Sequence, residues 1–115
     1  NQAAAISQSA QQLFNKTLYV EAALEYEKAA KLDQLEYAHF ENAASAFFMA
    51  GDMEKAINYS NNVINEFNPK TGKSEYIKGL AYLNIGENQK ACELLLKSMN
   101  FGFNQAKGTY DQYCN

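Results

Sequence analysis

The feature of this sequence that most constrains its fold is a segment that recurs at a nearly fixed interval. The segment from Gly51 to Phe67 has a counterpart on each side when Ala56 is aligned with Ala22 and with Ala91. The two spacings are 34 residues (56 minus 22) and 35 residues (91 minus 56). A period in this range is typical of proteins that stack copies of one supersecondary unit. We therefore expect an array of repeats that bury a shared core between neighbours.

Apolar residues recur at helical spacing along the whole chain. In the first segment, for example, Ile6, Ala10, Leu13 and Phe14 fall on one face of a helix and polar residues occupy the other. The pattern predicts seven helices and no strands. Their approximate ranges are residues 3–16, 19–30, 33–51, 52–68, 74–85, 88–100 and 104–113.

Local signals predict the ends of the middle helices. Asp33 followed three residues later by Glu36 has the form of a capping box, which would open the third helix. Gly51 suits the end of that helix, because glycine readily adopts the left-handed conformation found at many helix C-termini. Asp52 is then placed to cap the fourth helix with its carboxylate.

Three copies of one residue pattern resemble the tetratricopeptide repeat. Each copy has a small residue in mid first helix, an aromatic residue or leucine three positions later, and an alanine early in its second helix. These positions are Ala10, Leu13 and Ala22; Ala44, Phe47 and Ala56; and Gly79, Tyr82 and Ala91. The resemblance implies a single all-α domain, a right-handed superhelix with repeats at about 3–34, 35–69 and 73–103 and a capping helix at about 104–114. The sequence departs from the pattern at Thr17-Leu18, where the other copies have Gly51-Asp52 and Gly86-Glu87, and at Glu75, where the family has a large apolar residue.

The resemblance also implies a concave groove, lined by the first helix of each hairpin, that holds an extended or helical peptide. The residues projected onto this face are Gln11, Phe14, Asn15, Asn42, Ser45, Phe48, Met49, Tyr76, Leu80, Leu83 and Asn84. Phe48, Met49, Leu80 and Leu83 are apolar residues beyond those that the core stripe requires. Two interpretations stay open for these four: they contact a partner, or they pack under a neighbouring helix or the capping helix.

Chaperone-binding members of the family hold a carboxylate with a clamp of Lys and Asn side chains. Asn42 and Lys73 match that clamp, whereas Ser7, Gln11 and Ile77 stand where it needs a Lys, an Asn and a basic residue. Most of the clamp's charge is therefore missing, and the sequence disfavours an adaptor for chaperone tails.

Charge and composition argue against several other functions. Ten basic and 13 acidic residues give a net charge of −3, so we expect no nucleic-acid partner. No apolar run approaches the roughly 18 to 20 residues of a membrane span, so we expect no membrane insertion. One histidine and two cysteines are too few ligands for a structural zinc site, and Glu21, Glu25 and Glu27 are expected on a solvated helix face. We expect no cofactor, no metal and no catalytic site.

Thr71-Gly72-Lys73-Ser74 has the form of the end of a phosphate-binding loop. However, Phe67 replaces the first glycine of that motif, and a helix rather than a strand precedes it. The favoured function is a monomeric, non-catalytic module that binds a protein or peptide. The alternative is a structural protein that self-associates through the ends of its solenoid, which light scattering would distinguish.

The two cysteines are informative about the cellular compartment in which the protein is found. The tail around Ala91-Cys92, Ala106 and Tyr113-Cys114 resembles the closing repeat of tetratricopeptide proteins in bacterial cell envelopes. A disulfide between Cys92 and Cys114 would fit an oxidising compartment such as the periplasm. The alternative is two free, buried thiols in a cytoplasmic protein.

Overall fold

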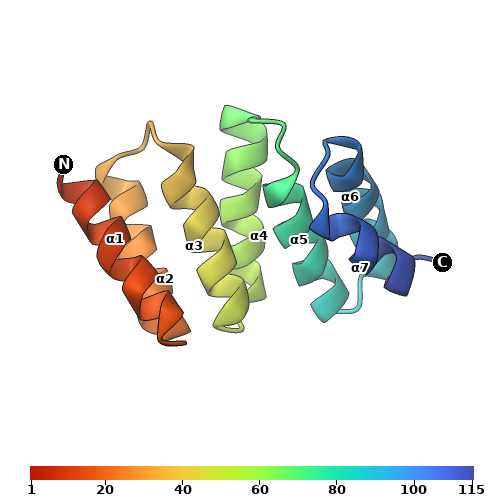
Figure 1. Ribbon diagram of the computed structural model, residues 1–115, viewed down its shortest axis with the longest axis horizontal. Coiled ribbons are helices and arrows are strands. Elements are labelled where there is room, and N and C mark those ends of the chain that lie inside the picture. Colours follow the sequence, from red (N-terminus) through yellow and green to blue (C-terminus); the bar gives the residue numbers. More distant parts are fainter.

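Seven helices follow one another as antiparallel neighbours along the molecule, with α2 behind α1 and α7 in front of α6, and the two termini lie at opposite ends (Figure 1). The structure is a computed structural model that describes residues 1–115. The helices are α1 (Gln2–Asn15), α2 (Tyr19–Leu32), α3 (Tyr37–Met49), α4 (Met53–Asn62), α5 (Lys73–Asn84), α6 (Asn88–Asn100) and α7 (Gln105–Tyr113). The prediction of an all-α solenoid is confirmed, and the molecule measures 44 × 26 × 21 Å. None of the helices combines the length and the apolar character needed to span a membrane.

The hairpin turns share one hydrogen-bonded geometry, including the turn where the sequence departs from the repeat pattern. The Asp52 N–H donates to the Phe47 carbonyl at 2.9 Å, and the Leu18 N–H donates to the Leu13 carbonyl at 3.0 Å. Such a bond closes a helix end and requires a left-handed residue within the turn. Gly51 supplies it with φ of +89°, and Thr17 supplies it with φ of +62°. The first turn therefore forms in spite of a residue that is strained in this conformation.

One of the two predicted helix starts is confirmed and the other is wrong. Asp52 Oδ1 accepts a hydrogen bond from the Lys55 N–H at 3.1 Å, as expected of a helix cap. Asp33 does not cap α3, because its Oδ1 accepts from the Leu35 N–H at 3.3 Å and α3 begins four residues later at Tyr37. Aspartate often bonds the backbone two residues ahead, and this turn competes with the capping box.

The predicted fourth helix continues beyond α4 with a wider winding. Residues Val63–Phe67 form a π-helical segment, η1, and the Asn68 N–H closes it on the Val63 carbonyl at 2.8 Å. Asn68 then turns the chain with φ of +49°. The Phe67 ring ends up 5.7 Å from the Phe40 ring, so the wider turn still packs onto α3.

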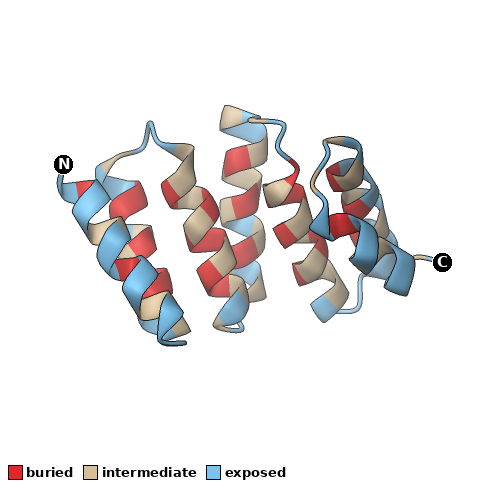
Figure 2. Ribbon diagram, viewed as in Figure 1, coloured by how far each residue is buried: buried red, intermediate tan, exposed pale blue.

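Small residues allow the paired helices to approach closely. Buried positions lie where helices face one another (Figure 2), and half of them are alanines. A Cβ on Gly79 would lie only 3.2 Å from the Leu95 side chain, so this glycine sets the spacing of α5 and α6. The main apolar cluster spans the first two hairpins and reaches α5 only at Ala81.

The C-terminal end is held by contacts of a different kind. A disulfide joins Cys92 on α6 to Cys114 after α7. The Ser98 hydroxyl donates to the Gly72 carbonyl at 2.7 Å, and a Cβ on Gly72 would lie 2.7 Å from the Ser98 carbonyl oxygen. The glycine of the phosphate-loop-like sequence is thus a packing position against the segment that leads into α7.

Candidate functional site

The predicted groove residues belong to α1, α3 and α5, and the structure gathers eight of the eleven around two hollows. The N-terminal hollow, of about 130 Å³, is lined by Gln11, Phe14, Tyr26, Asn42, Ser45 and Lys73. The C-terminal hollow, of about 420 Å³, is lined by Phe48, Leu80, Leu83, Asn84, Asn88 and Tyr113. Both hollows draw on α3, which supplies Asn42 and Ser45 to one and Phe48 to the other.

The N-terminal hollow is polar, and hydrogen bonds hold two of its side chains, Tyr26 and Gln11. The buried Tyr26 hydroxyl donates to Gln11 Oε1 at 3.1 Å, and Gln11 Nε2 donates to Asn15 Oδ1 at 3.0 Å. Burial raises the pKa of Tyr26, so this hydroxyl keeps its proton at neutral pH and remains a donor. These two bonds fix the orientation of the Gln11 amide.

The C-terminal hollow is apolar at its floor and polar at its rim. Phe48, Leu80 and Leu83 are half-buried, whereas Asn84 and Asn88 are exposed. Phe48 also packs against the main apolar cluster. This side chain therefore takes part in the core and in the hollow, and the two interpretations of it are not exclusive.

Three predicted groove residues line neither hollow. Asn15 lies beside the N-terminal hollow as the acceptor from Gln11. Met49 is 45% exposed at the end of α3. The Tyr76 ring lies 5.1 Å from the Phe103 ring, so it packs α5 against the segment before α7.

Four residues that line the hollows were not predicted to belong to the groove. Tyr26 and Asn88 come from second helices, Tyr113 comes from the capping helix, and Lys73 is the first residue of α5. A projection of first helices alone leaves out the first three. Lys73 carried a signal, because it and Asn42 are the two residues that match the carboxylate clamp.

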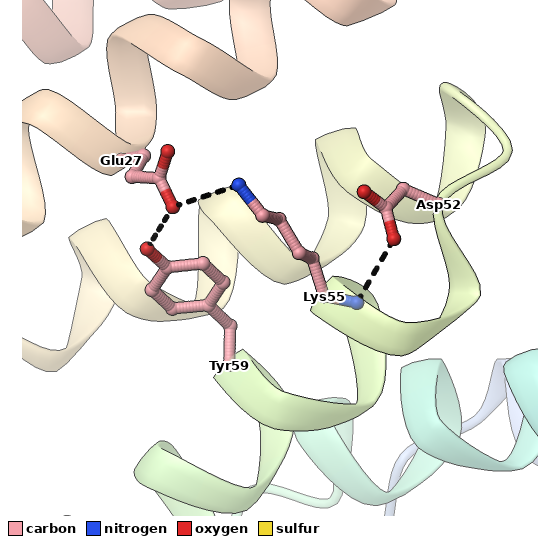
Figure 3. Close-up of polar contacts among 4 residues, drawn as sticks. All are labelled: Glu27, Asp52, Lys55 and Tyr59. Atoms are coloured by element: carbon pink, nitrogen blue, oxygen red, sulfur yellow. Dashed lines mark hydrogen bonds and ion pairs between the residues drawn. The ribbon is translucent and has the colours of Figure 1, made fainter.

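One carboxylate that the sequence placed in solvent is instead part of a contact between hairpins. Glu27 on α2 accepts from the Tyr59 hydroxyl, and its Oε2 lies 3.5 Å from Lys55 Nζ (Figure 3). Only 15% of the Glu27 side chain is exposed. The correction follows from tertiary structure, because the Tyr59 and Lys55 side chains reach Glu27 from α4. The pattern of a single helix cannot show such a neighbour.

Comparisons with known proteins give structural matches alone. No family model and no curated protein matches the chain. The first TPR of Spaghetti (RPAP3), solved with the HSP90 peptide SRMEEVD, has a TM-score of 0.88 at 19% identity over 97% of this chain and 90% of that one. The Sgt2 TPR domain from Aspergillus fumigatus has a TM-score of 0.77 at 18% identity, over 97% of this chain and 81% of that one. MamA has a TM-score of 0.81 at 22% identity, over 99% of this chain and 73% of that one.

Proposed function

We propose that this chain, which has the fold of tetratricopeptide repeat domains, is a non-catalytic, monomeric module that binds a protein or peptide across its two hollows. The observation that carries the proposal is the pairing of a polar hollow with an apolar one along the same first helices. The amides and hydroxyls of the N-terminal hollow are suited to hydrogen bonds with the backbone of a partner. The floor of the C-terminal hollow is suited to an apolar side chain that anchors the partner. A structural neighbour bound to a peptide supports this function for the fold.

The lining residues define the chemistry of the expected partner. Lys73 is the one charged side chain among the residues that line the two hollows. We therefore expect binding to depend on apolar and neutral polar contacts and to change little between low and physiological salt. A steep loss of affinity with salt would instead indicate a charged surface elsewhere on the molecule.

The test of this proposal is partner capture with Leu83→Glu. The partner is first identified by crosslinking in the source cells, and its affinity is then measured with purified protein. A charge in the C-terminal hollow should weaken binding by more than about 1 kcal/mol, or roughly fivefold in Kd, with helicity unchanged. Leu83 is preferable to Phe48 for this purpose, because Phe48 also contacts the core.

Leu96→Glu is the matched control. Leu96 is an exposed leucine of the same hairpin and lines neither hollow. The Leu96→Glu substitution should leave the affinity for the partner and the helicity unchanged. A folded Leu83→Glu protein that still captures the partner, or equal losses in both variants, would place binding on another face.

The alternative function is self-association through the first hairpin. Val20, Leu24 and Leu32 on α2 are each more than half exposed, and Leu35 in the following turn is 90% exposed. Light scattering over a wide concentration range tests this. Self-association would be favoured if the molecular mass of the parent protein rises with concentration while that of the Leu24→Glu variant stays at the monomer value.

We place the protein in an oxidising compartment, the periplasm or cell envelope, as part of the same proposal. The disulfide between Cys92 and Cys114 supports this location, since such bonds persist mainly outside the reducing cytoplasm. Intact-mass measurement after alkylation, on protein taken directly from its source, gives the test. Two alkylated cysteines in the native protein would favour the cytoplasm instead.

A further inference from the structure

A third hollow, here called the lysine pocket, lies between α5 and α6 on the face of α5 opposite Leu80 and Leu83. It has a volume of about 300 Å³ and is lined by Lys78, Tyr82, Lys90, Glu93, Leu94 and Lys97. Lys78 and Lys90 both approach the Tyr82 ring, with Nζ atoms 5.9 Å and 5.6 Å from its centroid. Two ammonium groups from different helices thus converge on one aromatic ring.

None of the three lysines of the lysine pocket forms an ion pair. The three ion pairs of the structure involve Lys28, Lys55 and Lys107. The lysine Nζ that donates a side-chain hydrogen bond also belongs to Lys107. Three ammonium groups and one carboxylate, that of Glu93, leave the lining residues with an excess of two positive charges.

The preceding hairpin shows that packing does not require this charge. With the repeat aligned at a spacing of 35, Lys90 corresponds to Lys55, which lies 4.9 Å over the Phe47 ring. Lys55 is paired with Glu27 from the hairpin before it, whereas the position 34 residues after Glu27 is the neutral Asn61. At the next junction along the chain, the corresponding lysine therefore lacks the carboxylate that the preceding hairpin supplies to Lys55.

Two further substitutions add charge at the same place. Lys78 stands where the preceding repeat has the fully buried Ala43, and Lys97 stands where it has Asn62. Burial lowers the pKa of Lys78, repulsion from Lys97 and Lys90 lowers it further, and the Glu75 carboxylate opposes the change. Like charges held together in this way are stabilised by a bound anion.

We propose that the lysine pocket binds a divalent oxyanion, either free phosphate or the phosphoryl group of a larger ligand. Lysine ammonium groups bind phosphate as point charges with several donors, and an excess of two positive charges matches a dianion. The Tyr82 ring and Leu94 give the pocket an apolar wall, and its volume leaves room for a group attached to the phosphorus. The site is separate from the two hollows of the groove, with which it shares no lining residue.

The test uses inorganic phosphate and a phosphoserine tripeptide as probes. NMR of the lysine ε-CH₂ groups should show saturable shifts confined to Lys78, Lys90 and Lys97, accompanied by a rise in Tm. Tighter binding of the tripeptide would assign the site to a phosphorylated ligand, and equal binding would assign it to the free ion. Absence of saturation by either probe overturns the proposal.

Variants distinguish a built site from general attraction to lysines. Lys78→Gln and Lys97→Gln should each weaken phosphate binding about tenfold, as expected when a charged donor is lost. Glu93→Gln should strengthen binding because it removes the one negative charge that lines the pocket. Lys16→Gln, at an exposed lysine outside the pocket, should change nothing. Equal losses in Lys16→Gln and Lys97→Gln would also overturn the proposal.

Discussion

The first two hairpins and the C-terminal end of the molecule are stabilised in different ways. The main apolar cluster joins α1, α2, α3 and α4, with Tyr26 and Phe47 as its large buried side chains. The third hairpin contributes Ala81 to that cluster, buries Ile77 and Leu95 outside it, and is further held by a buried Ser98 bond and the Cys92–Cys114 disulfide. Solenoid repeats contact their neighbours only, so the last repeat has a neighbour on one side and needs other constraints.

The largest expected effect is that of Phe47→Ala. Phe47 is 5% exposed and stacks on the Tyr59 ring at 5.8 Å, so its removal leaves a cavity in the main apolar cluster. We expect a loss of about 3 to 5 kcal/mol in the free energy of unfolding, measured by urea denaturation. Tyr82→Ala, at the equivalent half-buried position of the third hairpin, should cost about 1 to 2 kcal/mol. Equal losses would show that the two ends have equivalent cores.

Removal of the disulfide should have the next largest effect and should act on the other end of the molecule. The bond closes a segment of 22 residues, and loss of this constraint should cost about 3 kcal/mol in the chain-entropy model. The measurement compares the parent with a Cys92→Ser, Cys114→Ser double variant by urea denaturation and hydrogen exchange. Amides of α7 should exchange faster while those of α2 and α3 change little.

The same variant connects the C-terminal end to the groove. Tyr113, which lines the C-terminal hollow, immediately precedes Cys114. Release of α7 should therefore also weaken the binding of a partner that uses this hollow. Uniform loss of protection across all helices would contradict the view that the disulfide stabilises one end.

Most of the fold was predictable because the repeat itself carries the information. A small residue at Gly79 and an alanine at Ala56 indicate close helix pairs, and both are buried as expected. Asp33 was misassigned because its two local hydrogen-bonding choices, a turn and a cap, have the same sequence signature. The π-helical segment Val63–Phe67 shows no sequence signal that we can identify.

The candidate site was predictable in part. First-helix residues such as Leu80 and Asn42 line the hollows, because a repeat projects the same helix face in each copy. Tyr113 was missed because the capping helix lies outside the repeat. Lys78 and Lys97 were missed for another reason: a lysine on a helix usually faces solvent, and only the packing of α5 against α6 brings the two together.

Tyr59→Phe should have a moderate effect that depends on pH. The variant loses the hydrogen bond to Glu27, which should cost about 1 kcal/mol at neutral pH. Burial, the bond to Glu27 and the charge of Glu27 raise the pKa of Tyr59 above its ordinary value. The folded state therefore holds this proton more tightly than the unfolded state, and its contribution is lost as pH rises above about 10. The free energy of unfolding, measured by denaturation at pH 7 and at pH 11, should fall more between these two pH values in the parent than in the variant.

The smallest expected effect is a gain of stability in the first hairpin. Thr17 holds φ of +62° at the turn where the other hairpins have Gly51 and Gly86. A left-handed conformation costs a residue with a Cβ roughly 1 to 2 kcal/mol. Glycine avoids this strain but loses more backbone entropy on folding, which offsets part of the gain. Thr17→Gly should therefore raise the free energy of unfolding by about 0.5 to 1 kcal/mol, as read from the urea midpoint.

Gly51→Thr is the reverse experiment at the matched turn. A Cβ at Gly51 would meet no atom within 4 Å, so the substitution tests backbone strain without a clash. It should cost about 1 to 2 kcal/mol. If Thr17→Gly destabilises the protein while Gly51→Thr behaves as expected, the Thr17 side chain must stabilise the first turn. Its hydroxyl donates to the Lys16 carbonyl at 2.6 Å, and Thr17→Asn, which tolerates the left-handed conformation, would then separate that bond from the strain.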